Sequence, residues 1–128
     1  MIKYNAVKID FTAALLRLKE VLALEKTSVT RDSAIQRFEF TLDLAWKAIK
    51  AFLEEYRGIR CTSPKGCLKE AFLERIIEHD EFWLELVDLR NDTVHTYKEE
   101  LAENVFKKLP NAVQYFENLL MRLDEEGS

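Results

Sequence analysis

The sequence contains very little glycine and proline, with three Gly and two Pro among 128 residues. Chains that turn often need more of both, because glycine and proline set the backbone angles of tight turns. The shortage therefore predicts long helices joined by few loops. A chain of this length fits one compact domain, which we expect to cover residues 1–128.

Long apolar runs are also missing. The first residues, MIKYNAVKID, lack the apolar stretch of a secretory signal peptide, and no segment approaches the ~20 consecutive apolar residues of a membrane helix. We therefore expect a cytoplasmic protein that does not contact a membrane. The net charge of −4 argues against a surface that binds nucleic acid nonspecifically as a whole, although a local basic groove is compatible with it.

Potential zinc ligands are few. The chain has two cysteines, Cys61 and Cys67, and two histidines, His79 and His95, which lie far apart in the sequence. A structural zinc site needs about four ligands, usually with tighter spacing within each pair. We therefore expect no metal and no cofactor. In a cytoplasmic protein the cysteines of CTSPKGC are expected to be reduced thiols in a loop or at a helix start.

Apolar residues recur at three- and four-residue steps along nearly the whole chain, as they do in amphipathic helices. One such stripe contains Ile35, Phe38, Leu42, Ala45 and Ile49. About five helices are predicted, at residues 5–25, 31–57, 64–78, 80–97 and 99–123. Short connections between them favour an all-α fold, an up-and-down antiparallel helical bundle.

Several predicted helix ends carry residues that commonly cap helices. Thr30 is a candidate N-cap of the second helix, and Ser63 followed by Pro64 has the pattern of an N-cap and first residue of the third. Gly58 is expected to end the second helix, as a C-terminal glycine does. Pro110 should kink or restart the last helix, because proline disrupts a helix interior.

The polar segment RNDTVHTYKEE interrupts the apolar pattern of the fourth predicted helix. Trp83, Val87, Arg90, Val94 and Tyr97 follow one another at steps of four, three, four and three. These residues form one stripe of a helix surface, so the arginine occupies a position that its neighbours mark as apolar. Another stripe carries Asn91 and His95, which are four residues apart.

Spacing alone leaves two interpretations of Arg90 and His95 open. Arg90 can extend to the helix edge or pair with a carboxylate, for which Asp43, Asp88 and Asp92 are candidates, and His95 can be an ordinary residue near a helix C-terminus. Alternatively, the two residues belong to a chemical site. Because they diverge by about 140° around an ideal helix, that site would need a long arginine swinging toward the histidine, or a helix of a second copy.

Two segments together resemble a known family. RNDTVHTY matches the R-x4-H-x-Y pattern of the HEPN superfamily, whose members are small helical bundles. Many of them are metal-independent ribonucleases, and many are toxins of HEPN–MNT toxin–antitoxin pairs. The segment RDSAIQRFEFTLDLAWKAIKAFLEEYRG resembles the long second helix of the nucleotidyltransferase substrate-binding proteins, and it lies the expected distance before R-x4-H. The resemblance covers roughly residues 5–123.

The resemblance implies a bundle similar to the C-terminal domain of kanamycin nucleotidyltransferase. It also implies a homodimer with the two R-x4-H motifs at or near the interface, encoded beside a minimal nucleotidyltransferase (MNT). One possibility is a non-catalytic subunit that binds the substrate of this nucleotidyltransferase. The other is a ribonuclease toxin, which the MNT antitoxin silences by transferring AMP (AMPylation) to the tyrosine of the motif, here Tyr97.

A ribonuclease of this kind would use the 2′-hydroxyl of its substrate as the nucleophile, which predicts RNA rather than DNA as the substrate. The catalytic residues that the resemblance implies are Arg90, Asn91 and His95. An imidazole exchanges protons near neutral pH, which suits His95 to acid–base catalysis. The planar charge of Arg90 suits a phosphate, and Asn91 would orient the histidine or the phosphate.

Other charged residues are weaker candidates. Glu39 and Asp43 would orient Arg90, although a solvated helix face commonly carries such carboxylates. Four basic residues in and after the second helix would line a path for RNA or simply face the solvent: Lys47, Lys50, Arg57 and Arg60.

Overall fold

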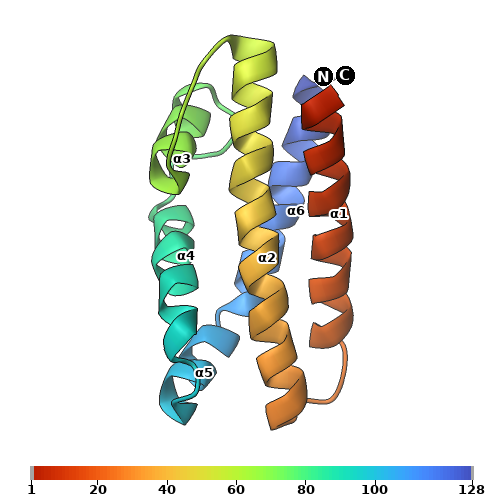
Figure 1. Ribbon diagram of the computed structural model, residues 1–128, viewed down its shortest axis with the longest axis vertical. Coiled ribbons are helices and arrows are strands. Elements are labelled where there is room, and N and C mark those ends of the chain that lie inside the picture. Colours follow the sequence, from red (N-terminus) through yellow and green to blue (C-terminus); the bar gives the residue numbers. More distant parts are fainter. Residues whose placement is uncertain (1, 128) are drawn as a thin grey trace.

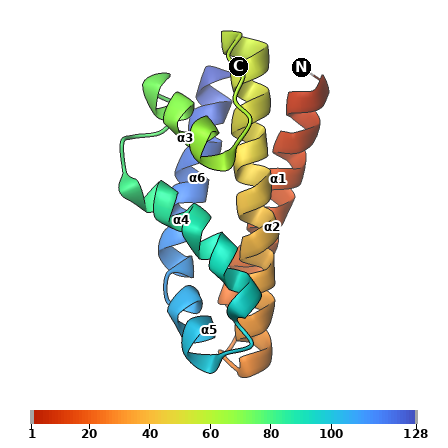
Figure 2. The same ribbon diagram turned by 60° about the vertical axis from the view of Figure 1, so that its left-hand side comes forward.

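The computed structural model describes residues 2–127 and contains six α-helices, with no strand in that range. The α-helices are α1 (Ile2–Leu22), α2 (Ser28–Phe52), α3 (Pro64–Leu73), α4 (Glu81–Asp92), α5 (Glu99–Phe106) and α6 (Leu109–Glu126). Figures 1 and 2 show α1, α2 and α6 side by side, α3 and α4 one after the other along them, and α5 near one end. The predicted all-α antiparallel bundle is confirmed. No helix within residues 2–127 is long and apolar enough to cross a membrane.

The ring of Phe116 on α6 lies at the centre of the core. Its centroid is 6.0 Å from that of Phe11 on α1, 6.3 Å from that of Phe38 on α2 and 6.0 Å from that of Trp83 on α4. All four side chains are buried, and packed aromatic rings bury large apolar areas. This cluster joins four helices that are distant in sequence, and it fixes α4, which carries the start of the polar segment, against the bundle.

Two threonines cap the start of α2 reciprocally. The Thr27 hydroxyl oxygen accepts the backbone N–H of Thr30 at 3.1 Å, and the Thr30 hydroxyl oxygen accepts the backbone N–H of Thr27 at 2.7 Å. Thr27 is thus the N-cap of a capping box. The prediction that Thr30 is the N-cap is wrong, because Thr30 is the third residue of the helix and completes the box from inside.

The other predicted helix boundaries at capping residues are confirmed. Gly58 ends the helical turn that follows α2, with a left-handed φ of 66°. The Ser63 hydroxyl oxygen accepts the backbone N–H of Gly66 at 3.0 Å, and Pro64 is the first residue of α3. Pro110 lies in the first turn of α6. The last predicted helix therefore restarts at this proline and becomes α5 and α6.

α3 ends at Leu73, earlier than predicted, in a motif that usually contains glycine. The backbone N–H of Ile76 donates to the carbonyl oxygen of Ala71 at 2.8 Å, and that of Arg75 donates to Phe72 at 3.0 Å. This pair of bonds is a Schellman motif, whose residue after the C-cap takes a left-handed conformation. Here that residue is Arg75, with φ of 60°. The sequence carried no glycine to mark this helix end.

α4 ends at Asp92, where threonine hydroxyl groups bind backbone carbonyl groups on either side of the helix end. The Thr93 hydroxyl donates to the carbonyl oxygen of Arg90 at 2.7 Å, and the Thr96 hydroxyl donates to that of Thr93 at 2.8 Å. Such local bonds compete with a regular helix, and the chain tightens into a 3₁₀ turn directly after α4. The predicted continuation of the helix to Tyr97 is therefore wrong.

Arg31 holds α5 against the first turns of α2. Its side chain is buried, and its guanidinium group pairs with Glu99 and Glu103 of α5 and with Asp32. These hydrogen bonds, that of Glu99 above all, raise the pKa of Arg31. A buried cation that lost its partners would be costly. The start of α5, at the end of the polar segment, is therefore fixed to α2.

Cys61 and Cys67 form a disulfide bond, so the prediction of two reduced thiols is wrong. The cap at Ser63 and Pro64 folds the loop back over the first turn of α3, which brings the two Cα atoms to 5.1 Å. This separation lies in the range that disulfides require. The earlier prediction rested on the expected cellular compartment, whereas the pairing follows from local chain geometry.

Replacing both Cys61 and Cys67 by serine should lower the free energy of unfolding by about 2 kcal/mol, because a cross-link over six positions restricts the unfolded chain. Urea denaturation followed by circular dichroism measures the change. A thiol reductant should destabilise the wild type by a similar amount and leave the double variant unaffected. Equal stability of the two proteins under oxidising conditions would contradict the prediction.

Candidate functional site around Arg90 and His95

Arg90, in the last turn of α4, binds two carboxylates of α2. Its Nε and Nη2 atoms donate to the two oxygens of Asp43 at 3.3 and 3.2 Å. Its Nη1 atom lies 3.2 Å from Glu39 and 3.3 Å from the hydroxyl oxygen of Thr93. The bond with Asp43 above all raises the pKa of the guanidinium group. Pairing with a carboxylate thus explains why an arginine occupies an apolar stripe.

The structure decides between the candidate partners of Arg90. Asp43 is the bidentate partner and Glu39 is a second one, so both of these carboxylates orient the guanidinium group. Asp88 instead pairs with Lys65 at 2.8 Å, and Asp92 is exposed. The sequence offered several carboxylates at suitable spacing, and the crossing of α4 over α2 selects two of them.

The Arg90 cluster has one positive and two negative groups. A guanidinium group has five N–H donors, and Asp43, Glu39 and Thr93 together engage all three of its nitrogen atoms. A phosphate that approached Arg90 in this arrangement would meet two carboxylates at the same place. Direct phosphate binding therefore requires at least one carboxylate contact to give way.

His95 and Tyr97 lie beyond the end of α4, on the exposed side of the turn. Their ring centroids are 6.4 Å apart in an edge-to-face arrangement. Both side chains are exposed, that of Tyr97 by 79%. Because α4 ends at Asp92, the stripe that joined Arg90 to Tyr97 on an unbroken helix is not formed, and Tyr97 lies near His95 instead.

The side chains of Arg90 and His95 are not linked by a polar interaction in the single chain. Within residues 2–127 no hydrogen bond or ion pair joins them, and none joins Asn91 to His95. Thr93 was not among the predicted site residues, yet its buried hydroxyl group links the guanidinium of Arg90 to the turn. The only sequence signal for it is its position inside the motif, three residues after the arginine.

A hollow of about 240 Å³ lies beside Arg90, between α2, α4 and the start of α3. It is lined by Leu42, Asp43, Trp46, Pro64, Val87, Arg90, Asn91 and Val94. Asn91 thus shares this hollow with Arg90, whereas His95 and Tyr97 are not among its lining residues. Val94 is 67% exposed, which leaves the rim of the hollow apolar.

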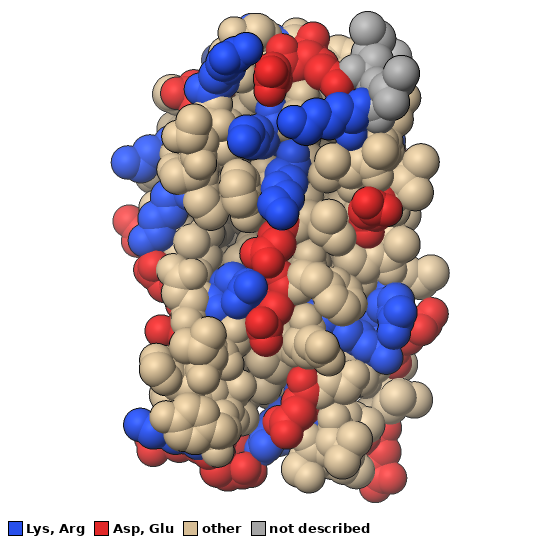
Figure 3. Space-filling model, viewed as in Figure 1, with Lys and Arg blue, Asp and Glu red and all other residues tan. Residues whose placement is uncertain are grey.

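The four basic residues considered for RNA binding have different surroundings. Arg57 is neutralised by Glu74 at 3.3 Å and Glu126 at 2.6 Å, so it fastens the end of α2 to α3 and α6. Arg60 is 86% exposed, with Glu54 at 4.0 Å. Figure 3 shows Lys and Arg side chains gathered over one half of this face, with acidic side chains next to them. Basic and acidic side chains are therefore mixed on the face in view.

Comparisons with other proteins agree with this fold. The family model described as nucleotidyltransferase substrate binding protein like matches residues 9–125. A crystal structure from Thermus thermophilus is 42% identical with a TM-score of 0.84, covering 88% of this chain and 98% of that one. A Haemophilus influenzae structure, described as revealing the fold of a substrate binding domain of a nucleotidyltransferase, is 26% identical with a TM-score of 0.80, covering 91% of this chain and 98% of that one.

One relative carries the name of an enzyme. The Haemophilus influenzae protein named probable ribonuclease HepT is 34% identical over 80 residues, which are 59% of this chain. The match spans 55% of that relative, just over half of its length. With the family model covering nearly the whole chain and the R-x4-H-x-Y segment in place at the end of α4, the chain belongs to the nucleotidyltransferase substrate-binding protein-like family, a HEPN-like family of helical bundles.

Proposed function

We propose that this chain is a HEPN-type toxin, a metal-independent endoribonuclease of a HEPN–MNT toxin–antitoxin pair. The observation that carries the proposal is the exposed His95, which follows five residues after a carboxylate-held Arg90 that lines an open hollow together with Asn91. The name of the Haemophilus influenzae relative, probable ribonuclease HepT, supports the same reaction class.

The working unit would be a homodimer. One chain leaves Arg90 and His95 without a polar interaction between them, and it exposes Val94 by 67% and Tyr97 by 79% next to them. Large apolar side chains exposed together often mark an interface. In a two-fold dimer the same patch meets itself, so a second copy would cover Val94 and bring its own histidine to the cleft, with Tyr97 left exposed at its edge.

The reaction would need no group beyond these side chains and the RNA. His95 of one copy accepts the proton of the 2′-hydroxyl, whose oxygen forms a bond to the adjacent phosphorus. The bond from phosphorus to the 5′-oxygen breaks, and the second histidine gives that oxygen a proton. The products are a 2′,3′-cyclic phosphate and a 5′-hydroxyl end. Arg90, assisted by Asn91, stabilises the charge on the phosphoryl oxygens.

A non-catalytic role is the second candidate, because the family model and one similar structure are both described in terms of nucleotidyltransferase substrate binding. In that case the hollow beside Arg90 would hold a substrate for a partner nucleotidyltransferase. Both candidate functions involve this partner. They differ in the role of His95, which is catalytic only in the ribonuclease.

His95→Ala should lower RNA cleavage at least about 100-fold and relieve growth inhibition, because it removes the proton acceptor. Its exposed side chain makes no hydrogen bond or ion pair within residues 2–127, so stability should be unchanged. Arg90→Ala should also abolish cleavage, and it should cost some stability because Asp43 and Glu39 lose their cation. Cleavage of labelled RNA and thermal melting measure these effects.

The activity of the wild-type protein distinguishes the ribonuclease from the non-catalytic substrate-binding role. If the purified wild-type protein neither cleaves RNA nor slows growth when it is expressed alone, the substrate-binding role is correct and the ribonuclease proposal fails. Size-exclusion chromatography with light scattering should show a dimer for the wild type and for His95→Ala.

The two carboxylates of the Arg90 cluster should respond in opposite directions. Glu39→Gln removes one negative charge and frees Nη1 for phosphate, so the KM for RNA should fall several-fold. Asp43→Asn weakens the bidentate anchor of the guanidinium group, so kcat should fall instead. Steady-state cleavage of a short RNA separates the two parameters. Equal loss of activity in both variants would contradict this division of roles.

Tyr97 would be the site of AMPylation. Its Oη atom would attack the α-phosphorus of ATP on the partner nucleotidyltransferase, with loss of pyrophosphate and of the phenolic proton. The 79% exposure of the side chain leaves it open to another protein. The attached AMP would add negative charge and bulk near His95 and would hinder RNA binding.

Incubation with the partner nucleotidyltransferase and ATP should add AMP to the wild type, as measured by intact-protein mass spectrometry. Tyr97→Phe should abolish the mass increase. Tyr56→Phe is a matched control, since Tyr56 is less exposed and its ring stacks on Phe52. Undiminished labelling of Tyr97→Phe would show that another residue is modified.

A further inference from the structure

A second hollow, of about 470 Å³, lies between α6 and the connection from α3 to α4, and it shares no lining residue with the hollow at Arg90. Its apolar lining comes from Ile76, Ile77, Trp83 and Leu119, three of which are buried. Around them stand polar side chains that are mostly exposed. A hollow with apolar walls and a few convergent polar groups is the usual form of a small-molecule site.

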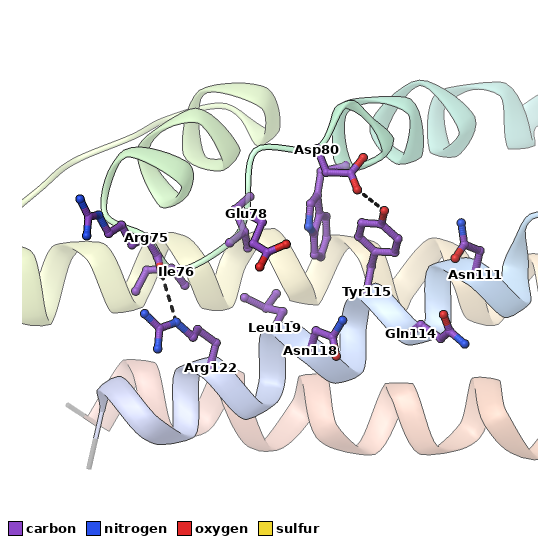
Figure 4. Close-up of a pocket in the computed structure, with 12 residues that line it drawn as sticks. Arg75, Ile76, Glu78, Asp80, Asn111, Gln114, Tyr115, Asn118, Leu119 and Arg122 are labelled. Atoms are coloured by element: carbon purple, nitrogen blue, oxygen red, sulfur yellow. Dashed lines mark hydrogen bonds between the residues drawn. The ribbon is translucent and has the colours of Figure 1, made fainter.

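Two bridges from the α3–α4 connection to α6 fix the ends of this hollow. At one end the Nε atom of Arg122 donates to the carbonyl oxygen of Arg75 at 3.1 Å. At the other end the Tyr115 hydroxyl group donates to the carboxylate of Asp80. Figure 4 shows these bridges on either side of Glu78. The walls are therefore in place before any ligand arrives.

α6 faces the hollow with a stripe of amides. Asn111, Gln114 and Asn118 follow at steps of three and four residues, which places them on one face of the helix. Each amide offers both donors and an acceptor. In Figure 4 the carboxylate of Glu78 lies on the same side of the Asp80–Tyr115 bridge as Asn118, and Gln114 and Asn111 lie beyond that bridge. Within residues 2–127 none of these four side chains has a hydrogen bond or ion pair.

Arg75 adds an unpaired cation at the end opposite to Asp80. It is exposed, and its guanidinium group has no ion-pair partner within residues 2–127. Its φ of 60° is a conformation that glycine adopts without strain and arginine does not. An arginine at a helix end that favours glycine points to a use for its side chain.

We propose that this hollow binds a nucleoside 5′-monophosphate, with the phosphate at Arg75 and an amino-bearing base between Glu78 and Asn118 of α6. Nucleobase edges present donors and acceptors side by side, which amide side chains match. Guanine fits best, because its N1–H and 2-amino groups can both donate to one carboxylate. The phosphate would accept hydrogen bonds from the guanidinium group of Arg75, whereas the Nη1 atom of Arg122 already pairs with Glu125 and Glu126.

The nucleotide would be either a free molecule or one residue of an RNA strand, and both present the same chemistry. The proposal does not depend on cleavage at His95. Binding is measured on the full chain, so a failure of ribonuclease activity and a failure of this site give different results.

Isothermal titration calorimetry should show binding of GMP, with IMP at least about fivefold weaker, because IMP lacks the 2-amino group. Inorganic phosphate should bind far more weakly than GMP. Glu78→Gln and Asn118→Ala should each weaken GMP binding about tenfold. Glu20→Gln, an exposed change on α1 outside the hollow, should leave it unchanged.

Arg75→Gly is the most informative variant, because it removes the positive charge and also relieves the backbone strain of the left-handed conformation. We expect an equal or higher melting temperature together with GMP binding about tenfold weaker. A merely structural Arg75 would give the first result without the second. Arg17→Ala, on α1 away from the hollow, is the matched loss of positive charge and should not affect binding.

Competition distinguishes the two sources of the nucleotide. Displacement of a fluorescent guanine-containing RNA by GMP, with both weakened in Arg75→Gly, would assign the site to RNA. GMP binding without such competition would assign it to a free nucleotide. The proposal is overturned if neither GMP nor the RNA binds, or if the variants of the hollow bind as the wild type does.

Discussion

The long helix α2 has to be covered along most of its length, and the rest of the bundle is arranged to cover it. Apolar and small side chains recur on its buried side, among them Ala34, Ala45, Ala48 and Ala51, and all four are at most 3% exposed. Small residues let neighbouring helices approach closely, so the hydrophobic gain of burial depends on several partners at once. A polar strip of α2 includes Glu39 and Asp43, and α4 crosses it at Arg90. The position of the candidate site therefore follows from how α2 is buried.

Sequence patterns were sufficient where a local residue type determines the backbone. Gly58, Ser63 with Pro64, and Pro110 each act within one helical turn, and each lies where it was expected. The predicted helix ends were wrong where the end is set by a contact, or by a residue type that also occurs inside helices. The hydroxyl of Thr93 ends α4, but threonine also occurs inside helices, and Arg75 stands where a glycine would have signalled the end of α3.

At the candidate site, too, local sequence predicted some features and the packing of helices decided the others. The motif supplied Arg90, Asn91, His95 and Tyr97, and spacing alone left Asp43, Asp88 and Asp92 as equal partners for the arginine. Only the packing of α4 on α2 selects Asp43 and adds Glu39. The separation of Arg90 from His95 could not be obtained from an ideal helix, because the helix ends between them.

His95 and Tyr97 are exposed, yet the segment that carries them is short and secured at both ends. Arg90 binds Asp43 and Glu39 before it, and Arg31 binds Glu99 and Glu103 after it. Both fixed points are on α2, so the segment spans the distance between two places on one rigid helix. Ordering it for a ligand or a second subunit then costs little conformational entropy, because most of that cost was met when the chain folded. His95 and Tyr97 are therefore exposed on a backbone segment that is already ordered.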